Sequence, residues 1–383
     1  MDPSPYKPLR IAIDARYVRE KPSGIGAYVR ALIDRLPALA PGDRFLFWAH
    51  PLAAHPLSTA ANAREVVVRQ GANSPLPVYW PAHYVSFHEV DLFHSPGNMM
   101  PRGLPCRTVA TVHDVMAIER PDLHLQGIER VAKSLYYQQA VWRALREATR
   151  LIAQSKATAD RICALLPGAA KRLMVIWSAP DRDLRPPDDM REAQAAAARL
   201  TNSDAPYLLL VGANAPNKRH ELAVAAFARS VPRPWRLVLV RPHKGSHLLV
   251  QLAKRLQIAD RLVWLEKLAR RDLVTLIQGA GGLVQPSVYE GFGLPVLEAM
   301  ACGCPVVASD IPAIREVTAG TALLFPAGDR EALGSALREF VRSPSLRQSL
   351  REQGLARARD FSWDTNAYAT LQVYRDAATA GRS

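Results

Sequence analysis

The segment from Gln285 to Asp310 reads QPSVYEGFGLPVLEAMACGCPVVASD, and the rest of the chain is interpreted outward from it. It starts at the end of an apolar strand, and Gly291 and Gly293 allow the next loop to approach a ligand closely. Pro295 suits the first position of a short helix, Gly303 suits its C-terminal cap, and another apolar strand follows. A glycine loop at a helix N-terminus presents backbone N–H groups and the positive end of the helix dipole. The segment therefore predicts an anion site at a strand-to-helix turn.

Two acidic residues lie on either side of this loop. Glu290 is at the exit of the strand and Glu298 is in the first turn of the helix, with seven residues between them. Carboxylates at these places could accept hydrogen bonds from a polyhydroxylated ligand above the start of the helix. The alternative is structural, since Glu298 would gain a few tenths of a kcal/mol, roughly, from the helix dipole and Glu290 would be a solvated loop acid. The spacing alone favours neither interpretation.

The string Glu-Gly-Phe-Gly-Leu-Pro at residues 290–295, followed by Glu298, resembles the E-x7-E signature of the retaining glycosyltransferase family 4. The resemblance implies the GT-B fold, in which two doubly wound Rossmann-like α/β domains face each other across a cleft. In this fold a C-terminal helix crosses back to the first domain. The resemblance also implies a nucleotide-sugar donor, with Glu290 at its sugar and Glu298 at its ribose hydroxyls. The loop residues that it assigns to the donor are Gly291, Phe292, Gly293 and Leu294.

The length of 383 residues predicts two domains, because a single core rarely grows so large. Strands and helices alternate through two successive parts of the sequence, each with an early glycine loop, as in doubly wound α/β domains. We expect a first, acceptor-side domain over residues 1–187 and a linker over 188–205. A nucleotide-sugar-binding domain is expected over 206–362, with a terminal crossover helix over 363–383 that Trp363 anchors.

The composition bounds the class of protein and its partners. No apolar run reaches the roughly 20 residues that span a bilayer, the start lacks a signal-peptide core, and four scattered cysteines fit reduced thiols, so a cytoplasmic protein is expected. The net charge of +14 suits nucleic acid, anionic lipid or diphosphate-bearing substrates. Because no nucleic-acid-binding motif is present, we expect no nucleic-acid partner. Residues 127–151 predict a basic helix with interleaved aromatics, either a membrane-binding surface or a solvated basic face.

Two positions in the first domain are candidates for the site. A strand over residues 9–14 is followed by Ser-Gly-Ile-Gly, in which Gly24 and Gly26 predict a glycine loop before a helix; a plain turn is the alternative. The strand over 107–112 ends in His113 and Asp114, at the strand end where open α/β sheets bind ligands. The family resemblance implies that the glycine loop closes over the donor diphosphate and that His113 reaches the donor sugar and phosphate. Asp114 is expected to orient His113 or to cap the next segment.

The second domain opens with an apolar strand over residues 207–211 and a turn at Gly212. Lys218 and Arg219 follow just before a helix, which places positive charge near free amides. In the family this turn carries an adjacent Arg-Lys pair that binds the diphosphate. Here Asn217 stands at the arginine place, so we expect Lys218 to be the phosphate ligand and Arg219 to be a weaker substitute.

Asp181 and Asp183 form a D-x-D sequence like the metal site of a different glycosyltransferase fold. No apolar strand comes immediately before them, and prolines bound the loop at residues 180–187. We therefore interpret them as boundary sequence and expect no metal and no other cofactor.

The resulting hypothesis is a metal-independent, retaining glycosyltransferase at the inner face of the cytoplasmic membrane. Its strings SGIGAY, FHSP and TVHD look most like bacterial mannosyl- or rhamnosyl-type transferases of polysaccharide assembly. GDP-mannose is the first expectation for the donor, UDP-sugars the next, and a lipid-linked or oligosaccharide glycan the expected acceptor. Two alternatives stay open. One is an enzyme with a soluble acceptor, of the sucrose, trehalose or glycogen type, and the other is a nucleotide-sugar-binding module without turnover.

Overall fold

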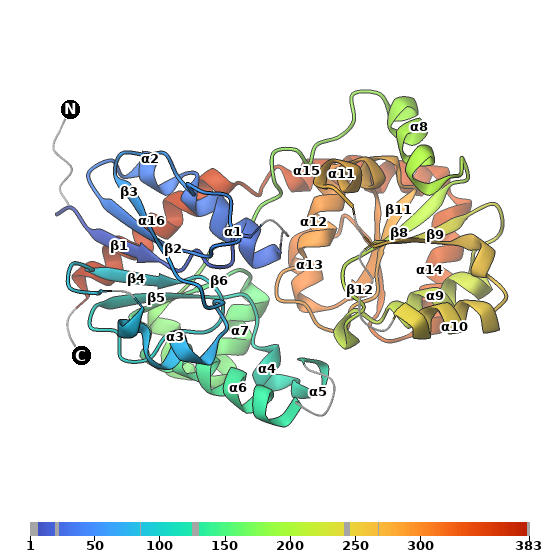
Figure 1. The fold of residues 1–383 in the computed structure, drawn as a ribbon. Coiled ribbons are helices and arrows are strands. Elements are labelled where there is room, and N and C mark those ends of the chain that lie inside the picture. Colours follow the sequence, from blue (N-terminus) through green and yellow to red (C-terminus); the bar gives the residue numbers. More distant parts are fainter. Residues whose placement is uncertain are drawn as a thin grey trace. The chain divides into compact units, whose positions relative to one another are not determined.

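The computed structural model describes residues 7–19, 23–84, 86–124, 130–240, 246–266 and 268–380. The chain divides into two compact units (Figure 1). Unit 1 comprises Met1–Ser178 and Ser362–Ser383, and unit 2 comprises Ala179–Phe361. Each unit contains one parallel sheet with helices on both faces, which confirms the predicted pair of Rossmann-like α/β domains.

The sheet of unit 1 has seven parallel strands in the order β3-β2-β1-β4-β5-β6-β7. The order changes direction between β1 and β4, and ligands of open α/β sheets bind at such a point, beyond the carboxyl ends of the strands. The strands are β1 (Arg10–Ile13), β2 (Arg44–Ala49), β3 (Ala63–Val67), β4 (Leu92–Ser95), β5 (Arg107–Val112), β6 (Arg150–Ala153) and β7 (Leu173–Val175).

Helices cover both faces of this sheet (Figure 1). The first face carries α1 (Gly24–Ile33), α2 (Leu36–Leu39) and α16 (Trp363–Thr379). The second carries α6 (Arg130–Glu147) and α7 (Lys156–Leu165), whose apolar residues share a buried cluster with β5 and β6. Shorter helices are α3 (Pro75–Tyr79), α4 (Met116–Glu119) and α5 (Pro121–His124), with 3-10 turns η1 (Pro81–His83) and η2 (Pro167–Arg172). Residues 127–129 of the predicted basic helix lie outside the described residues, and α6 covers Arg130–Glu147 of its range.

The last helix belongs to unit 1 although unit 2 precedes it in the sequence, so the predicted crossover is confirmed. Trp363 is buried, and its ring lies 6.1 Å from the ring of Tyr28 in α1. At the other end of the helix, the hydroxyl of Tyr374 lies 2.7 Å from Nδ1 of His94 in β4. The helix is therefore part of the core of unit 1.

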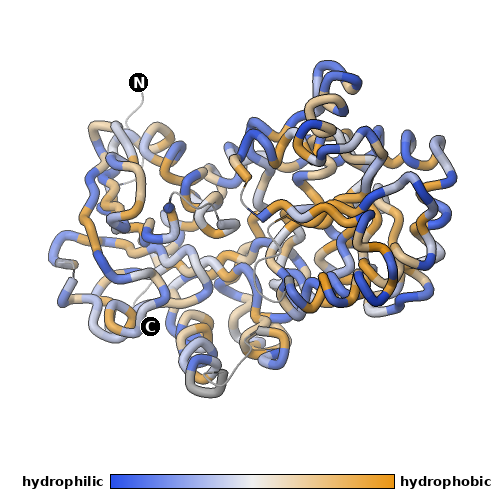
Figure 2. Tube along the Cα trace, turned by 45° about the vertical axis from the view of Figure 1, so that its right-hand side comes forward, coloured by the Kyte–Doolittle hydropathy of each residue, from blue (hydrophilic) through white to orange (hydrophobic). Residues whose placement is uncertain are grey.

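The sheet of unit 2 has six parallel strands in the order β10-β9-β8-β11-β12-β13. In Figure 2 these strands form a largely hydrophobic centre, and the surrounding helices alternate between polar and apolar residues. The strands are β8 (Tyr207–Val211), β9 (Arg236–Val240), β10 (Leu262–Leu265), β11 (Gly282–Gln285), β12 (Val306–Asp310) and β13 (Leu323–Pro326). The helices are α8 (Met190–Thr201), α9 (His220–Ser230), α10 (Ser246–Arg255), α11 (Arg270–Gly279), α12 (Leu294–Ala301), α13 (Pro312–Thr318), α14 (Arg330–Arg342) and α15 (Pro344–Ala358), with 3-10 turns η3 (Pro216–Lys218) and η4 (Ala259–Arg261).

The segment expected to link the domains, residues 188–205, contains α8, and α8 packs against α11 within unit 2. The contact is close, because a Cβ added to Gly279 of α11 would lie 2.6 Å from the Cβ of Ala197. This helix is therefore integrated into unit 2, and the compact unit already begins at Ala179.

Candidate functional site

The loop between β11 and α12 is shaped by a glycine in a left-handed conformation. Gly293 has φ +105° and stands at the N-cap of α12, and its carbonyl accepts the amides of Val296 and Leu297. The amides of Phe292, Gly293 and Leu294 make no hydrogen bond within the part of the chain that the structure describes. These N–H groups, together with the dipole of α12, are suited to an anion.

A short ion pair joins this loop to the turn after β8. Nζ of Lys218 lies 2.7 Å from Oε1 of Glu290, whose side chain is only 9% exposed. Nε2 of Gln285 also donates to Oε1 of Glu290, at 2.7 Å, and to Oγ of Ser287, at 2.8 Å. Lys218 and Gln285 therefore hold the carboxylate in one orientation. Gln285 was not predicted from the sequence, although its place at the carboxyl end of β11 was the available signal.

The turn after β8 departs from the expected arrangement of two cations. Asn217, at the arginine place, is buried, and its Nδ2 donates to the carbonyl of Tyr289. The amide of Val288 donates in turn to the backbone carbonyl of Asn217. Asn217 thus binds the β11–α12 loop and supplies no charge. Arg219 is 42% exposed and pairs with Glu221 at 3.2 Å. Gly212 has φ +114°, which favours glycine at the end of β8.

The second acid of the E-x7-E string lies beside an arginine that the sequence analysis did not select. Nη1 of Arg270, the first residue of α11, lies 3.8 Å from Oε1 of Glu298. The same guanidinium contacts Asp183 at 2.9 and 3.0 Å and Asp181 at 3.1 Å. The D-x-D acids, interpreted as boundary sequence, thus surround a side chain at the candidate site.

In unit 1, His113 follows β5 and its orientation is fixed by hydrogen bonds. Its amide donates to Oδ1 of Asn98, and its Nε2 lies 2.6 Å from the carbonyl oxygen of Pro96. Burial lowers the pKa of His113, against hydrogen bonds with the Pro96 carbonyl and the Gln154 side chain that raise it. Because the Pro96 carbonyl can only accept, the neutral ring carries its hydrogen on Nε2 and Nδ1 is its acceptor nitrogen. Asp114 accepts the amide of Met116, the first residue of α4, while Val115 stands at the N-cap of that helix.

Gly24 and Gly26 are part of α1 and not of a loop that precedes it, so the predicted glycine loop is wrong. The reason is the cap: Oγ of Ser23 accepts the amide of Gly26 at 3.0 Å, and the helix starts at Gly24. Gly26 is needed because an added Cβ would lie 2.6 Å from the carbonyl oxygen of Tyr17. Its amide is already bonded within the cap, whereas the amides of Gly24 and Ile25 make no hydrogen bond within the described residues.

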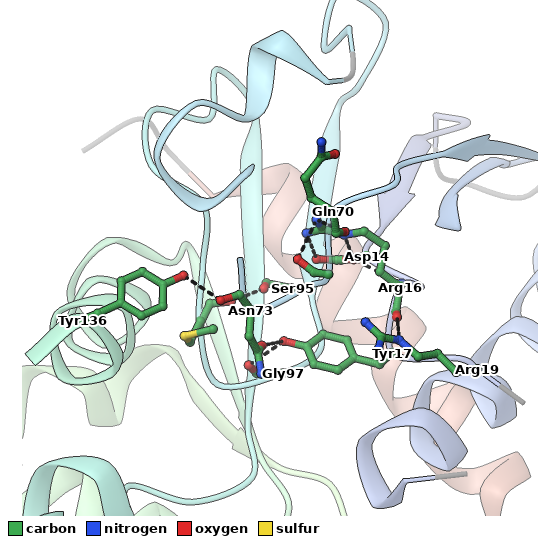
Figure 3. A network of polar contacts seen from close by, with 11 residues as sticks. Asp14, Arg16, Tyr17, Arg19, Gln70, Asn73, Ser95, Gly97 and Tyr136 are labelled. Atoms are coloured by element: carbon green, nitrogen blue, oxygen red, sulfur yellow. Dashed lines mark hydrogen bonds and ion pairs between the residues drawn. The ribbon is translucent and has the colours of Figure 1, made fainter. Parts of the chain in front are cut away.

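A second group of polar residues lies at the carboxyl ends of β1, β3 and β4 (Figure 3). Arg16 is fully buried and binds both oxygens of Asp14, and it also donates to the carbonyls of Gln70 and Gly71. The hydroxyl of Tyr17 lies 2.9 Å from Oδ1 of Asn73. These contacts form one wall of a cavity of about 540 Å³. Its lining residues are Arg16, Tyr17, Arg19, Ser23, Leu52, Gly71, Ala72, Asn73 and Ser74.

Comparisons with known proteins show which family and which fold the chain resembles. Residues 192–357 match the family model described as Glycosyl transferases group 1. The chain is 27% identical over 289 residues to the O-antigen chain mannosyltransferase B of Escherichia coli, covering 74% of each chain. It is 31% identical over 281 residues to a D-inositol 3-phosphate glycosyltransferase of Mycolicibacterium paratuberculosis, covering 70% of this chain and 61% of that relative.

Solved structures with the same fold extend over nearly the whole chain. A sucrose-phosphate synthase from Thermosynechococcus elongatus superimposes with a TM-score of 0.76 at 21% identity, over 97% of this chain and 99% of that one. Anabaena Alr3699/HepE, solved in complex with UDP and glucose, gives a TM-score of 0.75 at 18% identity, over 96% and 100%. Among the described residues, no helix is both long and apolar enough to cross a bilayer.

Proposed function

We propose that this chain, whose residues 192–357 match the group 1 glycosyltransferase family, transfers a hexose from a nucleotide-sugar donor to a glycan with retention of configuration. The observation that carries the proposal is the arrangement at the β11–α12 loop in unit 2. There Lys218, which follows β8, pairs with the restrained carboxylate of Glu290, which follows the neighbouring strand β11. Three backbone N–H groups of the same β11–α12 loop lie at the start of α12. These groups suit a ligand with both a diphosphate and hydroxyl groups.

Each group has a proposed role in donor binding. The amides of Phe292, Gly293 and Leu294, with Lys218, bind the diphosphate and stabilise the negative charge that develops as the nucleotide leaves. Glu290, held by Lys218 and Gln285, accepts hydrogen bonds from the sugar hydroxyls. Gly291 allows the backbone to approach the donor, and Gly212 shapes the neighbouring turn.

His113 is proposed to act at the donor sugar by hydrogen bonding. Its neutral ring presents Nδ1 as an acceptor, and its orientation is fixed through Pro96 and Asn98. Arg219 remains a secondary candidate for the diphosphate, because it is exposed and already pairs with Glu221. The departing phosphate oxygen is proposed to take the acceptor's proton on the face from which it leaves.

We propose that transfer requires no metal. The only D-x-D sequence of the chain is committed to an arginine, since both Asp181 and Asp183 are ion-paired with Arg270. The donor is proposed to be GDP-mannose, which the similarity to an O-antigen mannosyltransferase supports. UDP-glucose is the competing donor, supported by the fold shared with a protein solved with UDP and glucose.

The acceptor is proposed to be a lipid-linked glycan in cell-surface polysaccharide synthesis, reached by peripheral contact with the inner, anionic face of the cytoplasmic membrane. Three large apolar side chains on α3 and α6, or next to them, are exposed: Leu76 at 49%, Trp80 at 58% and Leu135 at 53%. The two helices are in contact, because the hydroxyl of Tyr79 donates to Gln139. With the exposed Lys133, these residues form what we call the α3–α6 surface. Exposed apolar groups beside a cation suit an anionic bilayer.

The aromatic residues of α6 that suggested membrane binding in the sequence are not the exposed ones. Tyr136, Tyr137 and Trp142 are partly buried and pack against the apolar cluster beneath α6. A soluble acceptor is therefore the second candidate function, and the fold shared with a sucrose-phosphate synthase favours it.

The proposal is tested by thermal unfolding with GDP-mannose, GDP, UDP-sugars or ADP-glucose, each with and without EDTA. At a ligand concentration of 100 Kd we expect a stabilisation of about 2.7 kcal/mol by one nucleotide class, unchanged by EDTA. Glu298→Ala should reduce that stabilisation. Stabilisation only with added divalent metal would overturn the metal-free mechanism. A chain that no nucleotide stabilises would contradict donor binding altogether.

A further inference from the structure

Three carboxylates from two parts of unit 2 converge on one guanidinium. Asp181 and Asp183 precede α8, Glu298 is in α12, and Arg270 begins α11. Asp183 binds Arg270 through both carboxylate oxygens, to Nε and Nη2, and Asp181 binds Nη2. The remaining nitrogen, Nη1, is the one beside Glu298. A planar guanidinium held in this bidentate way has little freedom to rotate.

The charges around Arg270 determine what it can do. Two aspartates already balance its positive charge, so it is poorly suited to bind the donor diphosphate directly. Burial opposes the charge, but the hydrogen bonds to Asp183 and the carboxylate of Glu298 together raise the pKa of Arg270 above its usual value. The guanidinium is therefore a fixed cation beside Glu298, whose side chain is 21% exposed.

We propose that Arg270 is a positioning residue for Glu298 and that Asp181 and Asp183 hold it in place, so that the Glu298 carboxylate meets the ribose hydroxyls of the donor in one orientation. The inference rests on the proposed function of Glu298. It assigns to the D-x-D sequence and to the start of α11 a part in donor recognition. Because ribose lies away from the reacting sugar, this contact should contribute equally to binding the donor and the transition state.

The first test compares Arg270→Gln with the wild-type protein. Arg270→Gln should raise the KM for the donor about tenfold, with kcat changed less than about threefold, as expected for uniform binding. Arg270→Lys should restore part of the affinity because it keeps the charge without the bidentate geometry. Arg315→Gln is the matched control, since Arg315 makes a comparable surface pair with Asp310 in the same unit.

The second test separates positioning from a structural role. Wild-type protein should bind a ribonucleoside diphosphate more tightly than its 2′-deoxy analogue, and Arg270→Gln should reduce that ratio towards one. In a Glu298→Ala background, Arg270→Gln should have no further effect on donor KM, because the two residues act in series. Additive effects, or an unchanged ribose-to-deoxyribose ratio in a folded Arg270→Gln protein, would overturn the inference. A wild-type protein that binds no nucleotide would instead contradict the proposed function.

Discussion

Nζ of Lys218 and Oε1 of Glu290 lie 2.7 Å apart, although 72 residues separate them in the sequence. Both side chains are largely buried, at 20% and 9% exposure, so neither can be removed without leaving the other poorly compensated. The pair joins the turn after β8 to the loop before α12. A cation for the diphosphate and a carboxylate for the sugar are thereby set at a fixed separation.

Removing the positive member should lower the rate of transfer as well as leave Glu290 poorly compensated. For Lys218→Met we expect a loss of about 10²–10³-fold in kcat/KM, because charge on the leaving diphosphate is no longer stabilised. The measurement is steady-state transfer with the donor identified by thermal unfolding. Lys254→Met, in α10 of the same unit, is the control. Equal rates for Lys218→Met and wild type would exclude Lys218 as a phosphate ligand.

The left-handed glycine before α12 should tolerate no side chain. In Gly293→Ala the alanine would have to adopt φ +105°, and its Cβ would lie 2.8 Å from Cδ1 of Ile314. We expect a loss of about 1–3 kcal/mol in unfolding free energy and weaker donor binding, since the loop amides would move. Gly320→Ala is the matched control, because it also has positive φ, but an added Cβ meets no described atom within 4 Å. Donor affinity in Gly320→Ala should remain that of wild type.

A buried hydrogen bond between the last helix and the sheet should stabilise unit 1. Tyr374→Phe removes the hydroxyl that lies 2.7 Å from Nδ1 of His94, and we expect a loss of about 1–3 kcal/mol in chemical unfolding. Tyr368→Phe, on the same helix but 59% exposed, should change stability by less than about 0.5 kcal/mol. Indistinguishable midpoints for the two variants would mean that the Tyr374 bond contributes nothing.

The same histidine predicts how stability depends on pH. Burial lowers the pKa of His94 from 6.5 to about 3. Between these values the unfolded chain binds a proton that the folded chain does not, so the unfolding free energy falls as the pH is lowered through this window. The slope from this one group approaches about 1.4 kcal/mol per pH unit. Urea unfolding of wild type and His94→Gln between pH 7 and pH 4 should give the shallower slope for the variant, and parallel curves would contradict the assignment.

The α3–α6 surface should bind anionic bilayers. Wild-type protein is expected to sediment with vesicles that contain phosphatidylglycerol and not with neutral phosphatidylcholine vesicles. Leu76→Ser with Trp80→Ala should weaken that binding at least about tenfold, because each exposed apolar side chain contributes about 1.5–3 kcal/mol when buried. Leu248→Ser, which removes an equally exposed leucine from unit 2, is the control. Equal sedimentation of the two variants would favour the soluble acceptor.

Local sequence patterns predicted most of the sheet strands, because buried parallel strands appear as short apolar runs bounded by turns. Arg107–Val112 and Tyr207–Val211 match their predicted ranges. The start of α1 was not predicted, because a serine cap and a glycine-rich turn look alike in sequence. Only the structure shows that the hydroxyl of Ser23 accepts the amide of Gly26 and so caps the helix. Short helices such as α3 carry too few residues to show a period.

In the candidate site, the loop from Glu290 to Leu294 was predictable because its glycines and its helix cap are consecutive. The partners of its acids were not, because they depend on how distant strand ends meet. Gln285 and Arg270 carry no local signal for the roles that their contacts with Glu290 and Glu298 indicate. Asn217 is a different case, because its position in the sequence did indicate that a positive charge is missing there. The structure adds that its side chain instead donates a hydrogen bond to the carbonyl of Tyr289.

Because α16 completes unit 1, the order of synthesis limits when each unit can fold. Unit 2 is one continuous stretch and can fold once its residues have left the ribosome, whereas unit 1 lacks α16 until the ribosome has passed unit 2. Until then Tyr28 and His94 are without Trp363 and Tyr374, and the part of the apolar sheet that α16 covers stays open to solvent. A premature stop just before residue 362 would therefore release a folded unit 2 that is joined to an incomplete, aggregation-prone unit 1.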